Sequence, residues 1–139
     1  MSDTAVLASV SRSHAIVYWI ATALVAAEFA VGGVWDLLRI HYVRTILEHL
    51  GYPAYFAIFM GLWKVPGSVV IVLPRLPRLK EWVYAGMVYE MTGAMFSHLA
   101  AGDGIVAVSV PLVVLGLIGV SWAGRPADRR DLIANHTSR

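Results

Sequence analysis

Four long apolar stretches, at about residues 15–35, 53–73, 82–101 and 105–123, limit what this chain can fold into. Each approaches the ~20 apolar residues that an α-helix needs to cross the hydrocarbon core of a bilayer. The chain is 58% hydrophobic and 14% charged, and its mean hydropathy of +0.67 is well above that of a soluble domain of this length. We therefore predict an all-α, polytopic membrane protein whose four transmembrane helices pack into one bundle.

The residues outside these stretches are too few for a second domain. They form a short N-terminus, three connections and a tail over residues 124–139, so we expect a single membrane domain over residues 1–139. Cysteine is absent, which excludes disulfides, thiolate nucleophiles, iron–sulfur clusters and cysteine-based zinc sites. The net charge of +2 reflects membrane topology better than nucleic-acid binding, because the basic residues cluster beside the apolar stretches.

The lysines and arginines predict the direction in which the helices cross the membrane. If four helices alternate, one side of the bilayer carries only Arg39 and Arg44. By the positive-inside rule both termini then face the cytoplasm, and the first and third connections lie outside. We expect a multi-pass protein of the inner (cytoplasmic) membrane. The basic residues on the inner side are Arg12, Arg75, Arg78, Lys80, Arg125, Arg129, Arg130 and Arg139.

The first stretch also resembles a secretory signal peptide, since Arg12 precedes an apolar run and small residues. The run is longer than the apolar region of a signal peptide, however, and Glu28 stands where a cleavage region would begin. We therefore expect an uncleaved first span.

The connection over residues 36–52 has a helical periodicity of its own. One helical face would carry its apolar residues, which are Ile40, Val43, Leu47 and Leu50. Charged residues stand between them, so the pattern predicts a short amphipathic helix on the outer surface. This helix could act as a lid over the bundle or simply cap the apolar ends of the other helices, and capping is the commoner role.

Three charged residues stand deep inside the apolar stretches: Glu28, Lys64 and Glu90. A charge in a bilayer costs at least a few kcal/mol, so these residues are the first candidates for a functional site. With a rise of about 1.5 Å per residue, Lys64 and Glu90 lie roughly 12–14 Å from the inner side and Glu28 roughly 20 Å, one turn further out. A lysine side chain can span that offset. We predict a cluster in which the two glutamates share one positive charge and one of them keeps its proton.

The sequence leaves two interpretations of this cluster open. A lysine and a carboxylate in one dry site perturb each other's proton affinity, as acid–base catalysis and proton transfer require. A structural ion pair that fixes the register of the helices would need the same residues. The unpaired third charge favours the functional interpretation. Its candidate catalytic residues are Lys64, Glu90, Glu28 and His98.

A second group of polar residues lies toward the outer side. His98 is about two turns beyond Glu90 on the same helix and next to Ser97, while Asp36 and Asp103 end the first and third stretches. Together they could form a polar path from the outer surface. One histidine with scattered aspartates is a weak metal signal, so we predict no metal site. A hydrogen bond between helices is the plainer role for the histidine.

Aromatic and methionine side chains surround the charges, with Trp63 before Lys64 and Tyr89 before Glu90. Core packing and lipid contact explain most such residues. The sharper interpretation is an apolar pocket with polar groups at its floor, which would admit a lipophilic ligand such as a quinone or terpenoid. Several glycines, in contrast, indicate close helix packing. They are Gly32, Gly33, Gly61, Gly67, Gly86, Gly93, Gly116 and Gly119.

Several short motifs resemble one group of membrane proteins. They are His-Leu-Gly-Tyr-Pro at 49–53, Gly-Leu-Trp-Lys at 61–64, Leu-Pro at 73–74, Arg-Leu-Lys-Glu-Trp-Val-Tyr-Ala-Gly at 78–86, Thr-Gly-Ala at 92–94, Ser-His-Leu at 97–99 and Gly-Asp at 102–103. With them the chain resembles the DoxX-like family of small four-helix membrane proteins over most of its length. The motif residues to which the resemblance implies a shared role are Lys64, Glu81, Ser97 and His98. Glu28 lies outside the motifs.

The resemblance implies a fold more firmly than a reaction. The wider superfamily includes a subunit of a thiosulfate:quinone oxidoreductase, membrane proteins of methylamine utilisation, secretory cargo receptors, receptor-assembly chaperones and, more remotely, vitamin K-dependent carboxylases. An activity that depends on Glu28 and Glu90 would belong to this chain and would not transfer from the family.

Three functions are compatible with these features. We favour an enzyme, or an enzyme subunit, that acts on a lipophilic molecule by acid–base chemistry, through isomerisation, cyclisation, epoxide opening or quinone-linked redox. The second is an assembly factor or partner subunit, whose charges hold the bundle or dock a helix of another membrane protein. The third is a small transporter or proton path, for which four helices offer little room unless a homodimer supplies it.

Overall fold

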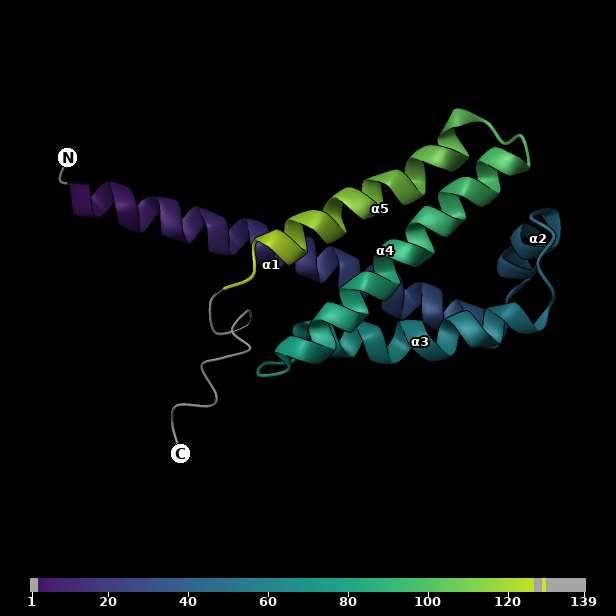
Figure 1. Ribbon diagram of the computed structural model, residues 1–139, viewed down its shortest axis with the longest axis horizontal. Helices are drawn as coiled ribbons and strands as arrows, with labels where there is room; N and C mark the ends of the chain where they lie inside the picture. The colour runs from purple at the N-terminus through teal and green to yellow at the C-terminus, as the bar shows by residue number, and fades with distance from the viewer. Residues whose placement is uncertain (1–2, 127–128, 130–139) are drawn as a thin grey trace.

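Five α-helices make up the part of the chain that the structure, a computed structural model, describes: residues 3–126 and 129, with side chains from residue 12 onward. The helices are α1 (Asp3–Leu38), α2 (His41–His49), α3 (Tyr55–Val72), α4 (Pro77–Ala100) and α5 (Ile105–Ala123) (Figure 1). No strand occurs within these ranges, so the predicted all-α class is confirmed. Most of the predicted tail, residues 127–128 and 130–139, lies outside the described residues.

Three of the helices are long and apolar enough to cross a membrane: Arg12–Leu38 within α1, and the whole of α3 and α5. The protein is therefore a helical membrane protein. α4 has 24 residues and is long enough as well, but Glu90, His98 and several less apolar side chains lower its hydropathy. Its crossing at residues 82–101 stays a prediction.

Two helices begin earlier than the apolar stretches suggested. α1 begins at Asp3 rather than near residue 15, and α4 begins at Pro77 rather than near residue 82. Polar residues do not end a helix, and proline is favoured in a first turn because its missing N–H would have no intrahelical partner there. Lys80 of this early turn is fully buried, and its Nζ donates hydrogen bonds to the carbonyls of Val70 and Ile71. The start of α4 is thereby fastened to the end of α3.

The helices form an incomplete bundle in which α3 and α4 diverge. α1 packs along α3 and α5, and α4 packs along α5, whereas α3 and α4 make far less contact. Figure 1 shows α3 and α4 meeting at the turn that joins them and separating toward the end where α2 lies. The same view places the N-terminus and the α3–α4 turn at one end, and α2 and the α4–α5 loop at the other. The gap between α3 and α4 therefore widens toward α2.

The contact between α1 and α3 is a close approach through two glycines. A Cβ on Gly33 would lie 2.7 Å from the Cβ of Lys64, and a Cβ on Gly61 would lie 2.6 Å from the carbonyl oxygen of Gly33. Neither position has room for a side chain, so close packing is confirmed here. It is wrong for Gly86, Gly93, Gly116 and Gly119, where a Cβ would meet nothing within 4 Å.

Hydroxyl groups join α1, α4 and α5 in the core. The Ser121 hydroxyl lies 2.7 Å from Thr22 Oγ1 and 2.7 Å from the Tyr84 hydroxyl, and all three residues are buried. Nearby, the buried Arg125 binds Glu81 and places its guanidinium over the Tyr84 ring. Glu81, a residue of the family-like motifs, thus helps to close the end of the bundle at which α5 finishes. The apolar core beside this network comprises Val25, Phe29, Ile71, Tyr84, Met87, Met91, Val114 and Ile118.

The predicted amphipathic helix is present as α2. Its apolar face is buried through Val43 and Leu47, which pack with Ala57 of α3. Residues with positive φ flank the helix, Arg39 (φ 48°) before it and Gly51 (φ 80°) after it. These two turns fold α2 back over the ends of the longer helices.

Candidate functional site

Lys64 lies between two carboxylates in the interior of the bundle. Its Nζ is 2.9 Å from Asp36 Oδ2 and 2.7 Å from Glu90 Oε1. α1, α3 and α4 each contribute one member, which we call the Asp36–Lys64–Glu90 trio. The predicted pairing of Lys64 with Glu90 is present, and the trio connects the two helices that otherwise diverge.

The prediction of Glu28 as the second ion-pair partner of Lys64 is wrong, because that partner is Asp36. A Cβ on Gly32 would lie 3.7 Å from Lys64 Nζ and 4.0 Å from Glu28 Oε1, so Glu28 is beside the trio, on the exposed side of α1. The error has a geometric cause. Gly33 touches the stem of Lys64, which puts Asp36, three residues on, on the same face of α1. Counting depth from residue 15 missed this register.

Asp36 lies two residues before the end of α1, where its side chain is buried. It is 4% exposed, and its carboxylate is the ion-pair partner of Lys64 rather than a step in a path from the surface. Its side chain and that of Lys64 are more enclosed than that of Glu90, at 6%, 12% and 22% exposure. Two carboxyl groups therefore share one buried ammonium, so the second of them either keeps its proton, as predicted, or gains a further positive partner.

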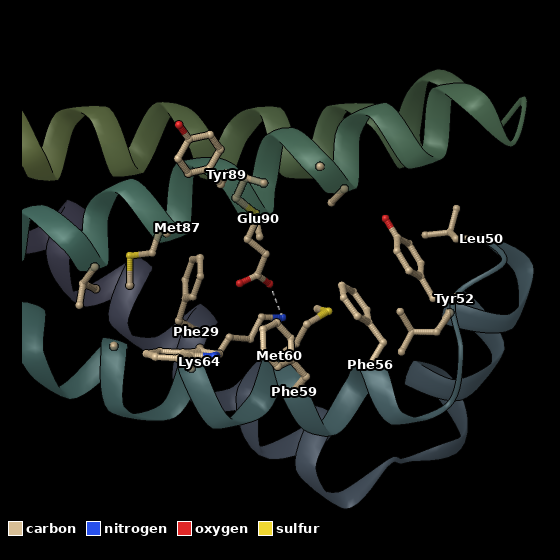
Figure 2. Close-up of a pocket in the computed structure, with 18 of the residues that line it drawn as sticks. Phe29, Leu50, Tyr52, Phe56, Phe59, Met60, Lys64, Met87, Tyr89 and Glu90 are labelled. Carbon is tan, nitrogen blue, oxygen red and sulfur yellow. Dashed lines mark ion pairs between the residues drawn. The ribbon is translucent and has the colours of Figure 1, made fainter.

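A cavity of about 570 Å³ lies between α3 and α4, with the trio at its wall. Figure 2 shows Lys64 reaching from α3 toward the Glu90 carboxylate on α4, with Phe29, Phe59 and Met60 close by. Apart from Lys64, Glu90, Tyr52 and His98, the wall is formed by apolar and aromatic side chains and glycines. The predicted apolar pocket with polar groups is therefore present, and the predicted residues Trp63 and Tyr89 border it.

α2 covers the end of the cavity where α3 and α4 are furthest apart. Ile46, Leu47 and Leu50 border the cavity there. Of the two roles considered for this helix, it therefore has the position that a lid requires. Two polar contacts hold its C-terminal side to α4.

The first of these contacts is a carboxylate shared by two histidines. Asp103 Oδ2 lies 2.7 Å from His98 Nδ1, and Asp103 Oδ1 lies 2.7 Å from His49 Nε2. The hydrogen bonds from His98 and then from His49 hold the pKa of the Asp103 carboxyl below its usual range. His98 thus binds the loop after its own helix rather than another helix directly, as its plainer predicted role required, and it also borders the cavity.

The second contact joins two hydroxyl groups. Ser97 Oγ donates to the carbonyl of Gly93 at 2.8 Å. It therefore accepts from the Tyr52 hydroxyl, which lies 2.7 Å away. Tyr52 and His49 were not among the predicted site residues, although both stand in the motif at 49–53 that carried the family resemblance.

The comparison with family models covers this whole arrangement. The model of the DoxX-like family matches residues 20–121. The chain belongs to the DoxX-like family. Searches of curated proteins and of solved structures return no match. The matched range of this DoxX-like protein contains the trio, the residues that border the cavity and both contacts of α2.

Among the described side chains, of residues 12–126 and 129, no three His, Asp or Glu side chains form a group that could hold a metal ion. Asp103 and its two histidines approach such a group most nearly, but both histidines use a ring nitrogen to bind the same carboxylate. At the cavity wall, the ionisable groups that bind each other are Lys64 and Glu90.

Proposed function

We propose that this DoxX-like protein binds a small lipophilic molecule in the cavity between α3 and α4 and acts on it by acid–base chemistry. The observation that carries the proposal is the placing of an ion pair, Lys64 with Glu90 at 2.7 Å, in the wall of an otherwise apolar cavity of about 570 Å³. That volume lies within the range of small-molecule sites, in which a few polar groups orient a ligand held by apolar contacts.

The ligand reaches the cavity from the bilayer rather than from water. Side chains at the cavity border are strongly exposed on the outside of the bundle: Trp63 by 70%, Tyr89 by 79% and Trp82 by 79%. In a membrane protein this surface faces lipid, and the little contact between α3 and α4 leaves the flank uncovered. The end toward water is covered by α2. A lipophilic molecule therefore enters sideways between α3 and α4.

Within the trio, Asp36 anchors Lys64, and Lys64 and Glu90 form the acid–base pair. Asp36 does not border the cavity and holds Lys64 from behind, whereas Lys64 and Glu90 both border it. Proton exchange between these two groups and a bound molecule would serve isomerisation, cyclisation, epoxide opening or quinone reduction coupled to proton uptake. His98 borders the cavity near α2 and orients the ligand or relays protons there, Ser97 holds Tyr52 beside it, and Glu28 adds negative charge beside the trio.

We also propose that the protein lies in the inner membrane with both termini in the cytoplasm and α4 as the fourth span. The support is the distribution of basic residues, because the end of the bundle with the α3–α4 turn carries most of them and the end with α2 carries Arg39 and Arg44. α4 runs alongside α5, which is one of the three apolar helices. A helix packed in this way shares the depth of its neighbour.

One observation favours a second function, that of a partner subunit or assembly factor. The exposed aromatic border between α3 and α4 would also accept an apolar helix of another membrane protein, or of a second copy of this chain. The trio would then be a structural ion pair. A crosslinking experiment separates the two functions.

A photoreactive benzoylphenylalanine in place of Tyr89 would report what occupies the border of the cavity. Illumination in membranes should add a mass of a few hundred daltons if the occupant is a small molecule. The matched control is the same residue in place of Val113, which is 63% exposed on α5 and does not border the cavity. An adduct with another polypeptide at position 89 would support a partner subunit. Lipid adducts of the same kind at both positions would exclude a specific ligand.

A further inference from the structure

The charges around the cavity are unequal in number, and this inequality indicates what kind of molecule the cavity holds. Glu90 faces Lys64 on the wall, Asp36 binds Lys64 from behind, and Glu28 Oε1 lies near the trio, since a Cβ on Gly32 would be 4.0 Å from it and 3.7 Å from Lys64 Nζ. Three carboxyl groups therefore surround one lysine. A negatively charged ligand would be repelled from this site, and a positively charged one would restore the balance.

The other lysines and arginines of the neighbouring helices, Arg44 on α2 and Arg78 and Lys80 on α4, do not border the cavity and so do not correct the balance there. Among the described residues that border the cavity, Lys64 is the one lysine or arginine. His98, the other basic group at the wall, is bound to a further acid, Asp103. α5 has no Asp, Glu, Lys, Arg or His between Ile105 and Ala123. The deficit of positive charge is thus a property of the whole site.

The arrangement of the trio allows Glu90 to turn from Lys64 to a ligand. If Lys64 had Glu90 as its single counter-ion, this movement would leave a buried ammonium unpaired, at a high cost. Asp36, 2.9 Å from the same Nζ, removes that obstacle. Glu90 is also the most exposed member of the trio, it borders the cavity, and Figure 2 shows its carboxylate in the space between α3 and α4.

Aromatic rings give a cation a second source of attraction. Phe29, Phe59, Trp63 and Tyr89 all border the cavity, and the faces of such rings attract positive charge, more strongly where water is excluded. We propose that the ligand of the cavity is a lipophilic organic cation, an amine or onium compound with apolar substituents, whose charge lies beside Glu90. This inference rests on the proposed function, because it assumes that the cavity is a ligand site.

Three probes of nearly the same shape test the charge preference directly: tetraphenylphosphonium, tetraphenylborate and the neutral tetraphenylmethane. Binding would be measured to the full chain in nanodiscs, with binding to empty nanodiscs subtracted because the probes also dissolve in lipid. We expect the cation to bind at least tenfold more tightly than the neutral probe, and the anion to show no saturable binding.

Two substitutions at Glu90 and one control show whether the preference comes from the trio. Glu90→Gln should weaken binding of the cation at least tenfold and leave binding of the neutral probe within about twofold, whereas Glu90→Asp, which keeps the charge, should retain a preference for the cation. Glu48→Gln is the matched control, since Glu48 is exposed on α2 and does not border the cavity. Monodispersity and melting temperature would be checked for each variant.

The outcomes distinguish this inference from the proposed function. Saturable binding of the neutral probe without preference for the cation would overturn the inference and leave the proposed function standing. Equal binding of the cation by Glu90→Gln and by the natural chain would also overturn it. If no probe binds saturably, both the inference and the proposed ligand site are contradicted.

Discussion

At the scale of single residues, the site depends on what each carboxylate of the trio touches. Asp36 is enclosed and binds Lys64 away from the cavity, while Glu90 faces both Lys64 and the cavity. Replacement of the lysine by an apolar residue would leave both acids buried without a counter-ion. Breaking a buried pair in this way typically costs ~3–5 kcal/mol, much more than an exposed charge contributes.

The first prediction follows from this enclosure. Lys64→Met should lower the free energy of unfolding by ~3 kcal/mol, and the double variant Asp36→Asn with Lys64→Met should recover part of the loss because one orphan charge is removed. Arg44→Met, at an exposed position of α2, is the control and should change stability by less than about 0.5 kcal/mol. Equilibrium unfolding in mixed micelles would measure all three. A Lys64→Met variant as stable as the control would contradict the structural importance of the trio.

At the scale of helices, α1 and α3 place Lys64 by approaching each other at Gly33 and Gly61. A Cβ at Gly61 would overlap a backbone oxygen, and backbone cannot rotate away as a side chain can. The helices would have to separate, and the Lys64 side chain would move with α3. The geometry of the trio therefore depends on Gly33 and Gly61, which have no side chain that could take part in a reaction.

The second prediction tests this contact with a matched pair of substitutions. Gly61→Ala should cost about 1–3 kcal/mol, as expected for overpacking. Gly116→Ala, in α5, should stabilise the protein by up to ~1 kcal/mol, since nothing lies within 4 Å of its added Cβ and alanine favours helix. Melting temperatures of the two variants in the same detergent would show the opposite signs. A stable Gly61→Ala protein would mean that α1 and α3 do not approach so closely.

The third prediction concerns how pH affects the contact of His49 and His98 with Asp103, which holds α2 in place. Hydrogen bonds from His98 and His49 hold the pKa of Asp103 below its usual range. The contact therefore stabilises the folded state fully above the ordinary carboxyl pKa of about 3.9, and the stabilisation is lost as the pH falls through the lower, folded value. We expect amide hydrogen exchange in α2, corrected for intrinsic rates, to stay constant from pH 7 to 5 and to rise below pH 4.

Variants of two acids make this measurement specific. Asp103→Asn should raise exchange in α2 already at pH 7 and abolish the further rise in acid. Glu48→Gln, within α2 itself, should behave like the natural chain, because Glu48 is exposed and makes no part of the contact. An unchanged acid-dependent rise in Asp103→Asn would show that another group controls the attachment of α2.

At the scale of the whole molecule, the sequence predicted elements better than it predicted contacts. Apolar length gave the helices and periodicity gave α2, because both are local properties of the chain. The partner of Lys64 is set by the register between α1 and α3, which depends on the fit at Gly33 and Gly61 and has no local signature. The opening between α3 and α4 likewise follows from the packing of α3 on α1 and of α4 on α5.

The last prediction concerns the orientation of the molecule in the membrane and the crossing of α4. Because the natural sequence has no cysteine, single cysteines can be introduced and labelled one at a time. Three exposed residues would be replaced singly by cysteine: Thr45 in α2, Arg78 at the start of α4, and Ala101 directly after α4. A membrane-impermeant maleimide should label positions 45 and 101 in intact spheroplasts and position 78 only after permeabilisation, since basic residues gather at the end with position 78. The converse pattern would invert the orientation. Labelling of positions 78 and 101 from the same side would show that α4, whose hydropathy Glu90 lowers, does not cross, and the cavity would then face water rather than lipid.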